Sequence, residues 1–214
     1  MFVDNFTSII RKDTDILICD LCFFPNSKQA LSVSPTSISI IETSNIETPK
    51  FLSNYNLSEN LQIEHGAFIN AACLSLNQFV VLTNKGRLAK FSVDKSFTIS
   101  LDSISVSQNS RYTCVTSYLS KYYFVGDDKG HLIIFSPTLT EIYINHISKS
   151  IKNLQSDDES HHVFSVKSVS LNPSKGFIFL SNCSILSFGL DSTLLGKTEF
   201  SIEFELLPLK EQQI

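Results

Sequence analysis

The chain has 214 residues, of which 43% are hydrophobic and 18% are charged, and its formal net charge is -4. This composition predicts one globular core and excludes an intrinsically disordered chain. The 17 basic residues are scattered, with Arg11-Lys12 as the only adjacent pair. No nucleic-acid partner is therefore expected, because nucleic-acid binding relies on clustered Lys and Arg.

The N-terminal region and the cysteines predict a compartment. Five charged residues among the first fifteen leave no room for the apolar segment of a signal peptide. No segment approaches the ~18 apolar residues that cross a bilayer, so no membrane partner is expected. The five cysteines are odd in number and widely spread, which is typical of reduced thiols. We therefore expect a cytoplasmic or nuclear protein.

In chain order, residues 1–14 are predicted to form an N-terminal arm or a closing strand. An apolar strand from Ile18 then ends at the turn Pro25–Lys28, because Pro cannot continue a strand ladder. A second apolar segment follows, and the same order recurs three more times. The first strands of the later copies are predicted at residues 69–76, 112–118 and 166–171. A fourth, outer strand is predicted at residues 96–101, 141–146 and 194–200.

The second segment of each copy is a hairpin that can be aligned with the others. The clearest copy is Tyr123–Phe135, where two apolar strands flank an Asp-Lys-Gly turn whose Gly supplies the positive φ of a tight hairpin. Val80–Phe91 and Phe177–Phe188 repeat it, and Ala30–Ile41 does so more faintly. The last positions of the four copies are separated by 50, 44 and 53 residues. A recurring all-β unit of this length is typical of a propeller blade.

The run Gly126–Phe135, together with the Pro-Xaa-Ser-Lys turns, resembles the WD-repeat β-propeller family over roughly residues 15 to 200. The resemblance implies four degenerate blades. Asp127 or Asp128 matches the family's turn Asp, and in two other copies Asn84 and Asn182 stand in its place.

The copies also depart from the family's pattern. Ile41, Phe91, Phe135 and Phe188 stand where the family ends a repeat on Trp. His65 and His162 each lie 26 residues before the last position of their copy, near the place of the family's His. No copy holds the complete His-Ser-Asp-Trp set, so packing is expected to stabilise the blades more than that network does. The predicted core residues are Leu21, Leu88, Phe91, Leu132, Phe135, Val169, Ile185 and Phe188.

The predicted fold is therefore an all-β, WD-type β-propeller of about four blades, partial or completed by a partner. The blades are expected at residues 15–60, 61–105, 106–150 and 160–200, followed by a C-terminal strand and tail at 201–214.

Four blades do not form the family's usual ring of seven, and open sheet edges promote aggregation. Three explanations remain open: completion by strands of a partner or of a second copy, a fragment of a longer propeller protein, or extra strands hidden in residues 43–64 and 200–214. We favour completion by a partner through Met1–Arg11 and Phe200–Ile214. Phe200–Leu207 alternates strongly and is predicted as a closing strand.

Two clusters are candidates for a metal-binding or enzymatic protein, the alternative function. Cys19 and Cys22 have the spacing of a zinc or redox pair, but no second pair exists, and on a strand positions i and i+3 face opposite sides. Both are predicted to be buried structural thiols. His161 and His162 follow Asp157-Asp158-Glu159 in a long polar segment that is predicted to be a solvated loop.

No nucleotide-binding, hydrolase or zinc-protease motif occurs in the chain. We therefore predict no catalytic, cofactor-binding or metal-binding residues and no cofactor. The predicted function is a non-catalytic WD-repeat scaffold that mediates protein–protein interactions in a multiprotein complex. Protein partners, including a homodimer, are expected.

Overall fold

A computed structural model describes residues 17–45, 49–106, 110–147, 164–190 and 202–207. The described residues form four antiparallel four-stranded sheets, in which each strand pairs with the next along the chain. The first sheet, blade 1, is β1 (Asp20–Phe23), β2 (Gln29–Val33), β3 (Ser37–Glu42) and β4 (Lys50–Asn56). Helix α2 (Glu59–His65) leads to blade 2, which is β5 (Phe68–Ser75), β6 (Gln78–Thr83), β7 (Arg87–Val93) and β8 (Ile99–Val106).

Blades 3 and 4 have the same order of strands. Blade 3 is β9 (Tyr112–Tyr118), β10 (Tyr122–Asp127), β11 (His131–Phe135) and β12 (Glu141–His146). Blade 4 is β13 (Val166–Leu171), β14 (Lys175–Leu180), β15 (Ile185–Gly189) and β16 (Phe204–Leu206). The predicted all-β fold with four blades is confirmed.

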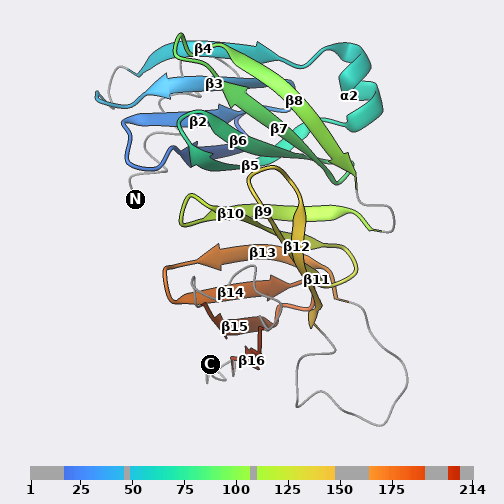
Figure 1. Cartoon of the computed structure of the whole chain (residues 1–214). Helices are drawn as coiled ribbons and strands as arrows, with labels where there is room; N and C mark the ends of the chain where they lie inside the picture. The colour runs from blue at the N-terminus through green and yellow to red at the C-terminus, as the bar shows by residue number, and fades with distance from the viewer. Residues whose placement is uncertain (1–16, 46–48, 107–109, 148–163, 191–201, 208–214) are drawn as a thin grey trace, which may run out of the picture.

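The blades are stacked in chain order, with blades 1 and 4 at opposite ends of the stack (Figure 1). The first strands of successive blades pack together, β1 against β5, β5 against β9 and β9 against β13. In the part of the chain that the structure describes, no comparable packing brings blade 4 against blade 1. We call the side of a blade that faces the next blade its forward face, and the opposite side its backward face.

The core consists of three apolar layers, one between each pair of neighbouring blades. Leu31 and Ile38 on the forward face of blade 1 pack in one cluster with Phe79 and Phe91 of blade 2. The rings of Phe79 and Phe91 are stacked, with centroids 5.2 Å apart. Because strand residues alternate between the two faces, a blade between two others needs apolar residues at nearly every position. This explains the fully buried runs in β6 and β10.

Most of the predicted core residues are buried, and the exceptions have a common cause. Leu21 and Ile185 are only half-buried. Leu21 lies on the backward face of blade 1 and Ile185 on the forward face of blade 4, where no further described blade covers them. The buried members are Leu88, Phe91, Leu132, Phe135, Val169 and Phe188.

The outer strands differ in part from the prediction. Two of them overlap the predicted segments, as β8 and β12. Residues 194–200 and 1–14 lie outside the described residues. The alternating Phe200–Leu207 segment contributes β16, which pairs with β15 and lies beyond the predicted blade limit at residue 200. A strand is thus present in the predicted segment, where it supplies the fourth strand of blade 4.

Candidate functional site

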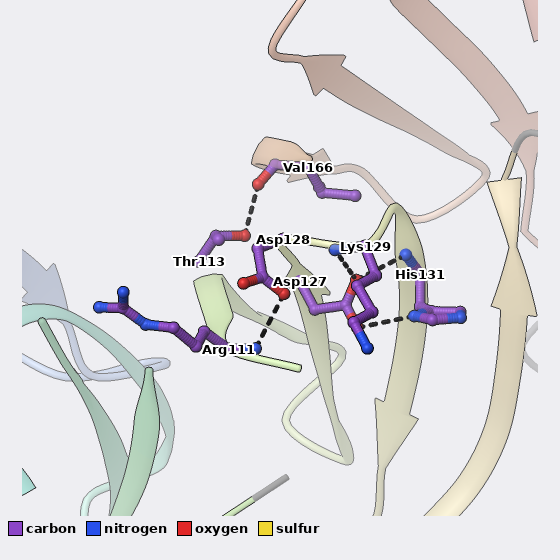
Figure 2. A network of polar contacts seen from close by, with 7 residues as sticks. All are labelled: Arg111, Thr113, Asp127, Asp128, Lys129, His131 and Val166. Carbon is purple, nitrogen blue, oxygen red and sulfur yellow. Dashed lines mark hydrogen bonds and ion pairs between the residues drawn. The ribbon is translucent and has the colours of Figure 1, made fainter. Parts of the chain in front are cut away.

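The turn between β10 and β11 is organised around Asp127, whose exposed fraction is 0%. Its Oδ1 accepts hydrogen bonds from the backbone N–H of Lys129 at 3.0 Å and of His131 at 2.7 Å. Its Oδ2 lies 2.7 Å from Nδ1 of His131 (Figure 2). Gly130 adopts φ 77° in this turn, and a Cβ there would lie 2.7 Å from the carbonyl oxygen of Phe164. Only Gly combines this φ with such a close backbone approach.

The next residue, Asp128, ties the turn to the start of its blade. Its Oδ1 accepts a hydrogen bond of 2.9 Å from the backbone N–H of Arg111, just before β9. Nη2 of Arg111 donates to the carbonyl oxygen of Asn84 in blade 2 at 2.6 Å. On the other side, the hydroxyl of Thr113 donates to the carbonyl oxygen of Val166 in blade 4 (Figure 2). The turn network of blade 3 therefore links three blades.

Blade 2 repeats this geometry with other residues. Asn84 takes the place of Asp128, because its Oδ1 accepts a hydrogen bond of 3.1 Å from Ala67 just before β5. Thr83 takes the place of Asp127: its hydroxyl donates to the carbonyl oxygen of His65 at 2.6 Å and accepts from the N–H of Arg87 at 3.3 Å. Gly86 has φ 70°, like its counterpart in blade 3.

The structure decides between the two candidates for the turn Asp. Asp127 is the buried residue that holds the turn, whereas Asp128 is exposed. Asn84 corresponds to Asp128 and not to Asp127. The prediction for Asn182 was wrong by one position, because Ser181 accepts the hydrogen bond from the residue before β13, Ser165. His65 contributes its carbonyl oxygen, and not its ring, to Thr83, and His162 lies outside the described residues.

Side chains of the first strands also join neighbouring blades. Oδ2 of Asp20 in β1 accepts hydrogen bonds of 2.8 Å from the side chain of Asn70 and from the N–H of Ala71 in β5. Oδ1 of Asn70 accepts a hydrogen bond of 3.0 Å from the N–H of Val115 in β9. These contacts fix the spacing of the first three blades at their inner strands.

The cysteines are free thiols in different surroundings. Cys19 is exposed and Cys22 is half-buried, which corrects the prediction that both are buried. Cys22 belongs to the apolar layer between blades 1 and 2, next to Cys73, while Cys19 precedes β1 and is not part of that layer. Burial raises the pKa of Cys73 well above its ordinary value and that of Cys114 to about 11. Such thiols are poor nucleophiles and poor metal ligands.

The described ranges contain no group of three or more His, Cys, Asp or Glu side chains that would hold a metal ion. His161 and His162 lie outside those ranges. The same ranges contain no helix of the length and apolar character needed to span a bilayer.

A second candidate surface is the forward face of blade 4, where Phe177, Phe179 and Ile185 lie beside Ser168, Ser170 and Ser187. Phe179 and Ile185 are cross-strand partners, and Phe177 lies two residues earlier in β14 on the same side. Phe179 is 39% exposed and the other two are half-buried. The equivalent residues of the other blades are all buried: Leu31, Val33 and Ile38 in blade 1, Val80, Leu82 and Leu88 in blade 2, and Phe124, Gly126 and Leu132 in blade 3. Each of those faces is covered by the next blade.

No family model and no curated protein sequence matches the chain. Among solved structures, the β-propeller domain of Cps50 (Swd1) from Myceliophteria thermophila is similar, with a TM-score of 0.63 and 12% identity over 88% of this chain and 57% of that chain. BamB from Moraxella catarrhalis is similar with a TM-score of 0.57 and 10% identity over 84% of this chain and 48% of that chain. The chain thus spans about half the length of both proteins. The likeness shows the fold: the chain has a β-propeller fold with four blades.

Proposed function

We propose that the chain is a non-catalytic, WD-type propeller scaffold whose protein partner packs against the forward face of blade 4. The observation that carries the proposal is the exposure of Phe177, Phe179 and Ile185 at positions that are buried in the other three blades. Large apolar side chains held on a flat sheet face are costly to leave in water, and burying one contributes about 1.5–3 kcal/mol. Such faces commonly mark protein–protein contacts.

The chemistry of the face indicates the kind of partner. Between neighbouring blades of this chain, each forward face is covered by the apolar backward face of another four-stranded sheet. We therefore expect the partner to supply a β-sheet with an apolar face, which continues the stack as a further blade. The match covers only about half of each of the two propellers of known structure, so both contain additional chain beyond it. A continuation of the same polypeptide would cover the face in the same way.

In the purified chain, a second copy offers a surface for this role. The backward face of blade 1 carries a cross-strand row in which Phe23 and Phe51 flank the buried residues Ala30 and Ile41. Phe23 is 50% exposed and Phe51 is 47% exposed. Without another partner, we expect the forward face of blade 4 in one copy to bind the backward face of blade 1 in the next.

Light scattering of the purified chain tests the proposal. We expect a dimer or larger assembly that becomes monomeric in Phe179→Glu, because a carboxylate on the face opposes its burial. Ile63→Glu is the matched control, since Ile63 is 66% exposed on α2 and its replacement should leave the mass unchanged. A folded, soluble wild-type monomer whose behaviour does not differ from that of Phe179→Glu would overturn the proposal.

The proposed compartment is the cytosol or nucleus, consistent with five free thiols. The alternative of a metal-binding or enzymatic protein has no support in the geometry around Cys19 and Cys22. Metal analysis of the purified chain tests this alternative, and one stoichiometric zinc or iron would favour it.

A further inference from the structure

The hairpin turns of blades 2 and 3 have the same backbone geometry but opposite electrostatic character. In blade 3, the buried carboxylate of Asp127 pairs with the ring of His131. In blade 2, Thr83 stands at the position of Asp127, and Arg87 stands at the position of His131. Thr83 reproduces one backbone hydrogen bond of the turn, to the N–H of Arg87. Its neutral hydroxyl cannot supply the negative charge that a guanidinium requires as a partner.

Two nitrogen atoms around this turn lack a partner within the described part of the chain. Nε of Arg87 and Nδ1 of His65 are both buried and have no hydrogen-bond partner there. The hydroxyl of Thr83 bonds to the backbone of both residues, to the carbonyl oxygen of His65 and to the N–H of Arg87. A buried donor without an acceptor costs about 1–3 kcal/mol, and more when it is charged. Native structures rarely leave such groups unsatisfied unless a ligand or water completes them.

The surroundings of the turn are basic. Lys85 and Arg111 are exposed, and their charged groups donate to backbone carbonyl oxygens, of Ile63 and Asn84 respectively. Two acidic groups lie nearby. Oε1 of Glu64 is 3.4 Å from Nε2 of His65, and Asp128 accepts the backbone N–H of Arg111. Neither carboxylate is bonded to the guanidinium of Arg87 in the described residues.

We propose that the turn Thr83–Arg87, together with His65, binds a carboxylate side chain from an acidic segment of a partner protein. The carboxylate would take the role in blade 2 that Asp127 has in blade 3. Arg87 suits this role because a guanidinium presents parallel N–H donors that match the two oxygens of a carboxylate. Lys85 and Arg111 would attract the same segment at longer range. This site lies on a different blade from the uncovered forward face of blade 4 and does not depend on it.

The experiment measures binding of a fluorescently labelled glutamate-rich peptide to the full chain. In Thr83→Asp, the chain supplies its own carboxylate, as blade 3 does, so we expect peptide affinity to fall at least about tenfold. Asn77→Asp is the matched control, because it adds the same charge to blade 2 at an exposed position outside the turn, and its affinity should fall far less. Arg87→Gln should weaken binding as strongly as Thr83→Asp.

A second measurement separates this effect from misfolding. We expect Thr83→Asp to retain the circular dichroism spectrum and the cooperative unfolding of the wild type, whereas a misfolded chain would lose both. Three outcomes would overturn the proposal: no saturable peptide binding to the wild type, equal loss in Thr83→Asp and Asn77→Asp, or stabilisation by inorganic phosphate without peptide binding. The last outcome would assign the turn to a small free anion.

Discussion

The replacement Asp127→Ala tests whether the turn network of blade 3 stabilises the propeller. The carboxylate of Asp127 has an exposed fraction of 0% and makes three hydrogen bonds, to the N–H groups of Lys129 and His131 and to the ring of His131. Hydrogen bonds to a charged acceptor contribute about 1.5–3 kcal/mol each, but they are not additive within one turn. Removing the carboxylate leaves the N–H groups of Lys129 and His131 without this acceptor, and an unsatisfied buried donor costs about 1–3 kcal/mol. We expect a loss of about that size in the free energy of unfolding.

Urea unfolding followed by circular dichroism measures this loss, together with two comparison variants. Asp127→Asn retains an acceptor oxygen for the backbone but loses the charge that faces His131, so it should cost about 1–2 kcal/mol. Asp128→Ala removes a single hydrogen bond at an exposed position and should cost less than about 1 kcal/mol. At this chain length, each kcal/mol corresponds to about 2–4 °C in melting temperature. If Asp127→Ala costs no more than Asp128→Ala, the network is not what holds the turn.

Three further predictions concern the core. Phe135→Ala should lower the free energy of unfolding by about 3–5 kcal/mol, because the ring is buried between blades 2 and 3. Phe51→Ala should lower it clearly less, since Phe51 is half exposed. Equal losses would contradict the apolar layer between these blades. The hydroxyl of Tyr123 is buried without a hydrogen-bond partner in the described residues, so Tyr123→Phe should raise the free energy of unfolding by about 1 kcal/mol, and a loss would reveal a partner. Burial raises the pKa of Cys114 to about 11, so the folded state retains a proton that the unfolded chain releases above pH ~8.5, and stability should fall as the pH rises from about 9 to 11. The stability of Cys114→Ala should depend less on pH over that range, and an unchanged slope would contradict the assignment.

The blades could be predicted from the sequence because each one is built from strands that follow one another along the chain. The repeated last positions Ile41, Phe91, Phe135 and Phe188 all lie on backward faces and are all buried. Strand alternation and turn residues encode that pattern within about a dozen residues. The outer strands were harder, because they are half exposed and carry a weaker apolar pattern. The fourth strand of blade 4 is β16, which lies beyond the segment predicted for it at residues 194–200.

The candidate sites depended on information that the sequence does not carry locally. A Thr at the end of a strand is ordinary, and only the superposition of Thr83 on Asp127 shows that a carboxylate is missing. Likewise, Phe179 has the large apolar side chain of a core residue, and its exposure depends on whether another blade packs against its face. The sequence also left Asp127 and Asp128 as alternatives for the turn Asp, because burial decides which of two neighbouring carboxylates stabilises a turn.

In the described part of the chain, every sheet is assembled from four strands that follow one another in sequence, and no blade takes a strand from another. Blades are joined by side-chain packing, by a few side-chain hydrogen bonds and by single backbone hydrogen bonds, from Phe68 to Pro35 and from Tyr112 to Gly86. A duplication or deletion of one genetic unit of about 45–50 codons would therefore change the number of blades without breaking any strand ladder. The same independence allows each sheet to form as it leaves the ribosome, before the next has been translated. This architecture can change in size during evolution while each hairpin keeps its own hydrogen bonds.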